Sequence, residues 1–536
     1  YSSQIVIARV TSPYPHEIAD SVFAEAPRAN FIDERVLEQL RRLNLKPSPP
    51  ASDSTFVRRA YLDTIGRLPT PAETGAFVAD TSVDKHARLA DRLLAREEFV
   101  DYWTYKWSDL LLVSGAKLRP EPMKAYYGWI RKSVAENMPW DEFARGVVTA
   151  QGSATEDGPS NFYAIHQDPE SMAENVSQAF LSLSLNCAKC HDHPLEKWTN
   201  DQYYAFANLF ARVRAKGWGG DPRSGDGKRT LYLEPRGDLI QPRTGQPQPP
   251  APLDAPALDP NDPGDRRETL ARWLTAPDNQ YFARSIANRL WANFLGSGVV
   301  EPVDDLRVSN PPSNEPLLAA LAEFVVAKNF DLKALMREIL VSQAYRRSST
   351  VLAENRDDRR HYARFQPRRL PAEVLSDAIT EVTQVNDTFT ELALNDGSTE
   401  ATKLYAPGTR ALQLSDSAVK NYFLKTFGRN AREITCECER SNQPSLVQVL
   451  HLANGSTVND KLAAPEGRVS SWLVRDLPPA QLVEELWWLA LSRPPTEAER
   501  TAAATELAAA PADEHRAAVE DLFWSLITSR EFLFQH

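Results

Sequence analysis

The sequence predicts a mostly α-helical protein built from two helical bundles. Apolar residues recur at helical spacing along most of the chain; Ile32, Val36 and Leu40, for example, share one helix face. Alternating apolar runs, the pattern of strands, occur only within residues 1–12 and 228–242. The 39 prolines far outnumber the 22 glycines, a balance that favours helices separated by stiff connections.

Residues 1–12 are expected to form one β-strand, and residues 13–30 a proline-punctuated linker. One strand alone is not stable. Because the chain opens inside this run and lacks an initiator methionine, we expect that a leader or an upstream β-domain preceded it.

The first bundle is predicted over residues 31–215. Lys46–Pro50 stops its first helix, and Thr70, Pro71 and Glu73 form a capping-box arrangement at the start of another. The expected helices begin at Phe31 and continue over residues 53–66, 71–79, 84–95, 97–113, 120–137, 170–186 and 200–213. The aromatic residues between Tyr102 and Trp107 are interpreted as core packing.

Residues 216–265 differ from both flanks because glycine and proline are dense there. Thr230–Leu233 is predicted to be a strand, and Gly237–Ile240 its partner in a short β-hairpin. We therefore expect a Pro/Gly-rich linker with a hairpin between the bundles.

The second bundle is predicted over residues 266–536, with a loop-rich stretch at 385–415. Its helices are expected at 266–275, 280–295, 315–328, 331–343, 371–384, 419–427, 445–453 and within 467–536. An internal repeat relates the two ends of the chain: Gly66–Glu73 resembles Ser492–Glu499, and Leu93–Phe99 resembles Leu526–Phe532. We infer two related helical modules.

Composition excludes several classes of function. The net charge of −11 and the pI of about 5.5 give little support to a nucleic-acid partner. No run of about 18 apolar residues is present to span a membrane. No Gly-x-Ser-x-Gly, His-Glu-x-x-His or glycine-rich phosphate loop marks a conventional hydrolase or nucleotide-binding enzyme.

Cys187-Ala188-Lys189-Cys190-His191 contains two of the four cysteines and carries the strongest functional signal. Cys-x-x-Cys-His is the attachment pattern of a c-type haem, in which both thiols form thioethers and the histidine is the proximal ligand. The same cysteines could instead hold zinc or another transition metal, or form a redox disulfide. All three interpretations remain open.

A six-coordinate haem needs a second axial ligand, usually methionine or histidine. No methionine lies within 100 residues after the motif, since the four are Met123, Met138, Met172 and Met336. His193 is too close to His191 to reach the opposite haem face easily, so we expect it to contact a propionate or to begin a helix. His166 and His451 are the remaining candidates, and His451 is the predicted one.

Cys436-Glu437-Cys438 contains the other two cysteines. One intervening residue is too few for the usual haem thioether pair. The pair could be oxidised, could bind a metal with a histidine such as His451 or His191, or could meet Cys187 and Cys190 between the two bundles.

These residues carry a resemblance to a known family. Cys187–Pro194 followed by Glu196–Thr199, together with Arg59–Asp63 and Gly66–Pro71, resembles the planctomycete cytochrome C-like domain. The second half resembles that domain's usual companion, a planctomycete-specific domain of unknown function. The matching stretches of the second half are Leu274–Asn279, Asn288–Trp291, Pro311–Asn314, Pro367–Leu370, Leu450–Leu452 and Glu531–Phe534.

The resemblance implies an exported bacterial protein of the periplasm or cell surface, with an Ig-like domain upstream as a possible source of the N-terminal strand. Our hypothesis is a c-type cytochrome-like electron-transfer protein with haem at Cys187 and Cys190 and a redox or cell-surface protein partner. The alternative is a non-haem surface protein whose Cys/His cluster is a structural metal or disulfide centre. A hydrolase is the least favoured class.

Overall fold

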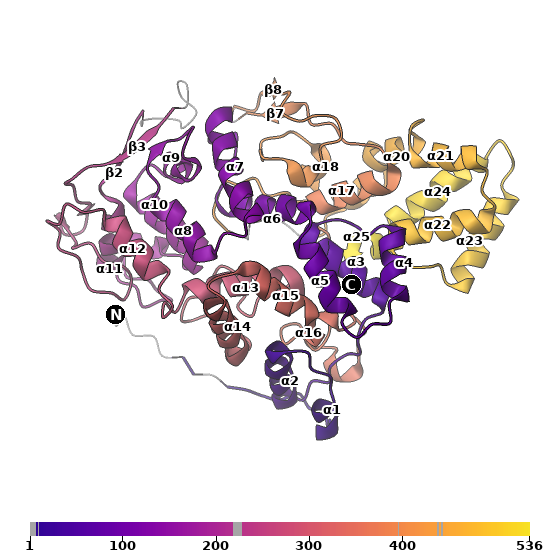
Figure 1. The fold of residues 1–536 in the computed structure, drawn as a ribbon, viewed down its shortest axis with the longest axis horizontal. Coiled ribbons are helices and arrows are strands. Elements are labelled where there is room, and N and C mark those ends of the chain that lie inside the picture. The colour runs from indigo at the N-terminus through magenta and orange to yellow at the C-terminus, as the bar shows by residue number, and fades with distance from the viewer. Residues whose placement is uncertain (1–6, 9, 218–227, 395, 437–438, 441–442) are drawn as a thin grey trace.

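The computed structural model describes residues 7–8, 10–217, 228–394, 396–436, 439–440 and 443–536. Figure 1 shows an elongated molecule with β2, β3 and α8 to α12 at one end and α20 to α24 at the other. The helices of the first half are α1 (Asp20–Ala24), α2 (Phe31–Leu43), α3 (Asp53–Ile65), α4 (Pro71–Ala79), α5 (Lys85–Leu94), α6 (Glu97–Leu110), α7 (Pro120–Ala135), α8 (Trp140–Val148), α9 (Asn161–Ile165), α10 (Pro169–Val176) and α11 (Asn200–Ala207).

The second half continues the same architecture. Its helices are α12 (Arg266–Leu274), α13 (Phe282–Leu295), α14 (Glu315–Ala327), α15 (Leu332–Val341), α16 (Gln343–Arg346), α17 (Ala372–Thr383), α18 (Tyr422–Thr426), α19 (Leu446–Asn454), α20 (Ser456–Ala463), α21 (Arg468–Arg475), α22 (Pro479–Leu491), α23 (Glu497–Ala509), α24 (His515–Ile527) and α25 (Arg530–Leu533). The prediction of a mostly α protein is confirmed.

Short strands accompany the helices. They are β1 (Gly152–Ser153), β2 (Val213–Lys216), β3 (Thr230–Leu233), β4 (Ile240–Gln241), β5 (Gln246–Pro247), β6 (Arg368–Arg369), β7 (Glu391–Ala393), β8 (Thr399–Ala401) and β9 (Phe534–Gln535). β3 pairs antiparallel with both β1 and β2, whereas β4 pairs with β5, β6 with β9, and β7 with β8.

The predicted repeat corresponds to two similar helix pairs, α3–α4 and α22–α23. Thr70 and Thr496 each cap the second helix of their pair and form a capping box with the glutamate three residues on. The arginine that follows the first helix pairs with a glutamate at the end of the module, Arg67 with Glu98 at 2.9 Å and Arg493 with Glu531 at 2.6 Å. The sequence similarity therefore extends to equivalent ion pairs.

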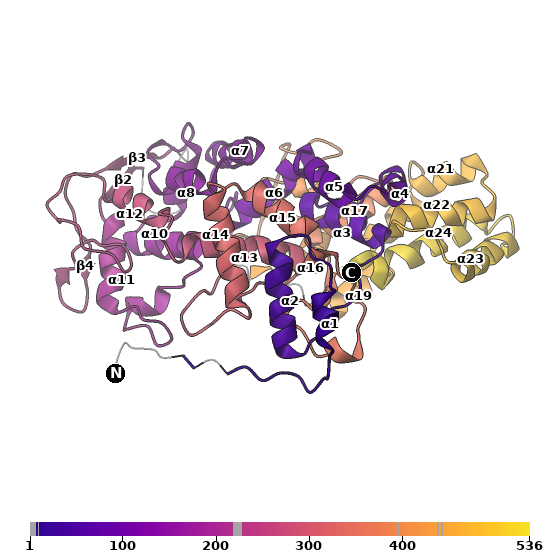
Figure 2. The ribbon, with the colours of Figure 1, turned by 60° about the horizontal axis from the view of Figure 1, so that its bottom comes forward.

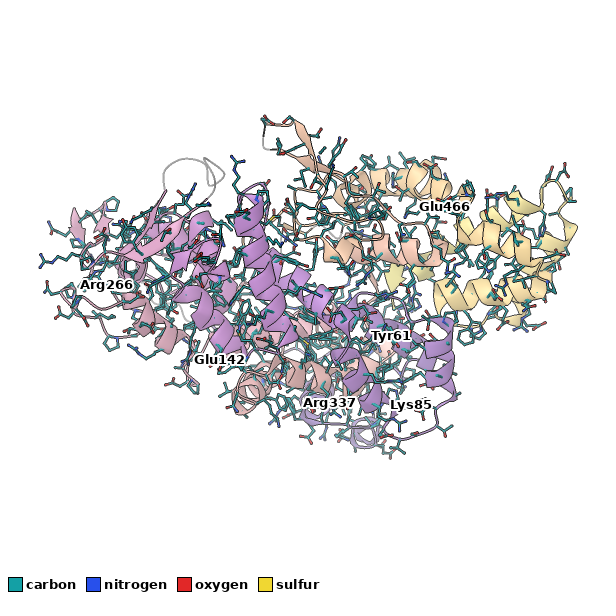
Figure 3. The ribbon with its side chains drawn as sticks, turned by 45° about the horizontal axis from the view of Figure 1, so that its top comes forward. Tyr61, Lys85, Glu142, Arg266, Arg337 and Glu466 are labelled. Atoms are coloured by element: carbon teal, nitrogen blue, oxygen red, sulfur yellow. The ribbon has the colours of Figure 1, made fainter. Side chains whose placement is uncertain are left out.

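Helices from the two halves pack on one another and bury a continuous hydrophobic core. α5 packs against α15, and α2 against α14, as Figure 2 also shows. Figure 3 labels Lys85 on α5 close to Arg337 on α15, and Arg337 pairs with Asp91 of α5 at 2.6 Å. Arg58 of α3 donates a hydrogen bond to the carbonyl of Ala490 at 2.8 Å, so the two repeated modules also meet directly.

Several local predictions need correction. Residues 7–8 and 10–12 are not in a strand, and the rest of the predicted N-terminal strand lies outside the described residues. Gly237–Ile240 is not the partner of β3: Pro235, which cannot donate to a strand ladder, follows β3, and Gly237 turns the chain with φ +135°. The true partners of β3 are β1 and β2, and the helix predicted over 200–213 reached only Val213, the first residue of β2.

Among the described residues, no helix has the length and apolar character needed to cross a membrane.

His86 is predicted to make folding stability depend on pH. Its ring lies edge-on to Phe56 and Phe77, with centroids 4.7 and 5.5 Å away, and burial followed by the charge of Arg346 lowers its pKa to about 4. Between pH 6.5 and 4 the unfolded chain binds a proton that folded His86 does not, so the free energy of unfolding falls as the pH decreases. The contribution is about 1–2 kcal/mol after allowance for solvent around the ring.

The measurement is urea denaturation of the unmodified protein and of His86→Leu at several values between pH 6.5 and 4. The leucine variant should lose less stability on acidification, because its side chain does not titrate. His515→Gln, at the first residue of α24, provides the baseline. Equal pH dependence in all three proteins would show that His86 does not contribute.

Candidate functional site

The Cys-x-x-Cys-His segment follows an irregular end of α10. The helix passes into a π-helical turn, η2 (Ser177–Leu181), and the chain then reverses at Ser182, whose φ is +54°. A 3-10 turn, η3 (Asn186–Lys189), then carries Cys187. The predicted helix over 170–186 therefore ends early. Such π-turns occur often at functional sites.

Asn200, the first residue of α11, holds this segment in place. Its side-chain amide donates to the carbonyls of Ala188 and Lys189 at 2.8 and 2.9 Å. Its backbone N–H donates to the carboxylate of Asp192 at 2.9 Å. Asn200 and Ala188 are buried, so the motif rests on the core while its functional side chains point away from it.

Both motif cysteines, Cys187 and Cys190, carry free thiols and are exposed to solvent. Cysteine is among the residue types most often buried. Two exposed thiols in one turn of chain therefore do not serve packing, and they are accessible to form covalent bonds with a group outside the core.

The ring of His191 is held in a tautomer suited to ligation. Its Nδ1 lies 2.8 Å from the carbonyl oxygen of Asp192. A carbonyl only accepts hydrogen bonds, so the proton is assigned to Nδ1, and Nε2 keeps its lone pair. Histidines that bind metals typically donate the other ring N–H to a carbonyl in this way.

A cavity of about 1010 Å³ lies next to the motif and is lined by residues from both halves of the chain. This volume is at the upper end of the 300–1,000 Å³ typical of ligand and cofactor sites. The lining residues used below are Lys117, His166, Asn175, Cys187, His193, Asp305, Arg307 and Cys436. The cavity is therefore large enough for a cofactor, and one wall carries a motif thiol.

His166 is one of the deeply buried titratable residues of the cavity wall. It is 5% exposed, and burial, with a smaller effect of Lys117, lowers its pKa to about 3. Nδ1 lies 3.2 Å from the hydroxyl of Ser171. Nε2 has no hydrogen-bond partner among the described residues. The wall thus contains a neutral imidazole with one unused nitrogen.

Three other residues of the cavity wall have shifted pKa values. Burial lowers the pKa of Lys117 and raises the pKa of Asp305. Burial and then the charge of Arg307 lower the pKa of His193. Titratable groups with shifted pKa values that share a cleft are typical of functional sites. The motif and the cavity together form the candidate site.

The second cysteine segment forms part of the same cavity and is anchored by buried ion pairs. Arg432 and Arg440, four residues before and after Cys436, each pair with Asp109 of α6 at 2.8 Å. Arg440 also pairs with Glu373 of α17 at 2.6 Å. Asp109 therefore fixes both sides of this segment.

Within this segment, Thr435 donates its hydroxyl to Asn175 of α10 at 2.8 Å, which ties the segment to the other cavity wall. Cys436 is disulfide-bonded, and Cys438 lies outside the described residues. Since Cys187 and Cys190 carry free thiols, the disulfide does not cross-link the two cysteine segments. The segments share a cavity without being bonded to each other.

His451 is not brought to the cavity. Its ring packs against Tyr422, Phe423 and Phe427, and its Nε2 is 2.9 Å from the hydroxyl of Thr457. His193 does line the cavity, and its Nδ1 accepts a hydrogen bond from the N–H of Leu195 at 3.2 Å. Within the described residues, no group of three or more His, Cys, Asp or Glu side chains could hold a metal ion. The predicted set of His191 with the second cysteine pair includes Cys438, which lies outside those residues, so it stays a prediction.

Comparison with protein families gives two matches in the order predicted from the resemblance. Residues 31–215 match PSCyt2, described as a protein of unknown function (DUF1549), and residues 266–507 match PSD1, described as a protein of unknown function (DUF1553). The chain thus contains a segment similar to PSCyt2 followed by a segment similar to PSD1. Neither the curated proteins nor the solved structures include a match. The motif thus belongs to the PSCyt2 domain, whereas Cys436 belongs to the PSD1 domain.

The sequence offered a meeting of the two cysteine segments as one of three alternatives, and it gave no sign of the contacts that hold the second segment at the cavity. The ion pairs of Asp109 join residues more than 300 positions apart, and no local pattern reports such contacts. His166 was one of two remaining candidates for the second axial ligand, beside His451. Its position after α9 gave no indication that it would line the cavity.

Proposed function

We propose that this protein transfers electrons through a haem attached covalently to Cys187 and Cys190, with His191 as the proximal ligand. The observation that carries the proposal is the state of the motif: two exposed free thiols precede a histidine whose Nε2 lone pair is free. The cavity beside Cys187 is large enough to receive part of a porphyrin.

The residues of the motif and of the cavity wall fit a covalently attached haem. Asn200 fixes the backbone between the two cysteines, so that both thiols are held on one short turn. Asp192 orients the imidazole of His191. Lys117 and Arg307 provide positive charge in the cavity wall for the propionate carboxylates of haem. When bound, haem would supply one-electron redox chemistry.

The PSD1 domain forms part of the same cavity and, in this proposal, docks the redox or cell-surface protein partner. We place the protein outside the cytoplasm, in the periplasm or at the cell surface. The disulfide at Cys436 supports that location, because disulfides persist in oxidising compartments and are rare in the cytosol.

A spectroelectrochemical titration of natively matured protein tests electron transfer. We expect haem absorbance that changes reversibly with potential, with a tenfold change in the ratio of oxidised to reduced protein for every 59 mV, as for one electron. Protein without haem absorbance, or with absorbance that does not respond to potential, would contradict the proposal.

The Cys436 disulfide favours one alternative, a non-haem surface protein with a structural disulfide centre. Alkylation of the denatured but unreduced protein separates the two proposals. The haem protein should show no reactive thiol at Cys187 or Cys190, since both form thioethers. Modification of both cysteines in protein matured by its native host would favour the alternative.

A further inference from the structure

His166 provides a buried ring nitrogen that the contacts of the folded chain leave unused. The residue follows α9, and its ring packs on Phe162 with centroids 4.7 Å apart. Its Nδ1 lies within hydrogen-bond distance, 3.2 Å, of the hydroxyl of Ser171. Nε2 is buried without a hydrogen-bond partner among the described residues. Leaving a buried polar group unpaired destabilises the folded state, so this nitrogen requires an explanation.

Other residues of the cavity wall that could ligate iron are already engaged. The Nδ1 of His193 accepts the N–H of Leu195, which leaves the ring proton on Nε2. Lys117 donates to the carbonyl of Glu433 at 2.7 Å. Cys436 is in a disulfide. No methionine lines the cavity among the described residues. His166 is therefore the strongest candidate donor in the described wall.

We propose that His166 is the second axial ligand, through Nε2, of the haem attached at Cys187 and Cys190. This inference rests on the proposed function and extends it from a single ligand to a bis-histidine site. Ser171 fixes the ring through Nδ1, as backbone Asp192 does for His191. Burial lowers the pKa of His166 to about 3, so its imidazole is neutral at physiological pH.

The experiment compares natively matured protein with His166→Ala by absorption and electron paramagnetic resonance spectroscopy. We expect the unmodified protein to be low-spin. The alanine variant should keep one covalent haem per chain and become high-spin, and added imidazole should restore the low-spin spectrum. His166→Gln repeats the test with a side chain closer in size and polarity, in case the alanine variant does not fold.

His451→Ala is the matched control. His451 packs among aromatic rings away from the cavity lining, so its loss should leave the spectrum low-spin. Absence of covalent haem in the unmodified protein would overturn the proposed function itself. Covalent haem that is high-spin in the unmodified protein, or low-spin in both His166 variants without imidazole, would overturn the axial role of His166 and leave the proposed function standing.

Discussion

Replacing Asp109 with alanine is expected to lower the free energy of unfolding by about 3–5 kcal/mol. Asp109 neutralises Arg432, whose side chain is 0% exposed, and Arg440, whose side chain is 9% exposed. Without this carboxylate, Arg432 remains charged and fully buried, and Arg440 keeps only Glu373. Removal of one partner from a buried ion network is costly because the remaining charge stays desolvated.

Asp20→Ala is the matched control, since Asp20 also pairs with an arginine at 2.9 Å but its side chain is 74% exposed. Its loss should cost about 0–1 kcal/mol. Urea denaturation measures both variants, and hydrogen exchange should increase around residues 432–436 only in the Asp109 variant. Similar destabilisation by the two substitutions would show that Asp109 does not anchor the second cysteine segment.

The double variant Cys187→Ala/Cys190→Ala is expected to lose covalently bound haem completely. Each thioether needs one cysteine sulfur, so the two single variants should retain one bond and stay haem-positive at reduced yield. His191→Ala should keep both thioethers but change the iron spectrum, because only the proximal nitrogen is removed. Haem staining after denaturing electrophoresis, together with intact mass, distinguishes these results.

Cys436→Ala/Cys438→Ala removes the same number of cysteines from the other segment and serves as the control. It should retain covalent haem, because the Cys436 disulfide is separate from the free thiols of the motif. Equal haem content in the two double variants would contradict attachment at Cys187 and Cys190.

Local signals in the sequence predicted the helices well. Capping residues and prolines set the boundaries of α2, α3 and α4, where Asn30, Ser52 and Thr70 cap the first turns. Short elements were less visible. The five-residue α9 and the four-residue β2 have too few positions to show a period, and the pairing of β2 with β3 is set by tertiary contacts.

The candidate site likewise has one part that local sequence signals identify and one part that depends on tertiary contacts. The Cys-x-x-Cys-His motif is local, so the sequence alone identified Cys187, Cys190 and His191. That Cys436 shares a cavity with Cys187 depends on Asp109, Arg432 and Arg440, which meet only after the two halves fold together. His451 was favoured over His166 as axial ligand because sequence spacing carries no information on burial.

Peptide mapping by mass spectrometry shows whether Cys187 and Cys190 carry haem. Natively matured protein is digested without reduction, and the peptide containing Cys187–His191 is isolated. We expect this peptide to carry the mass of one haem, bound through both cysteines. A peptide at its bare mass, with Cys187 and Cys190 free or joined in a disulfide, would contradict it.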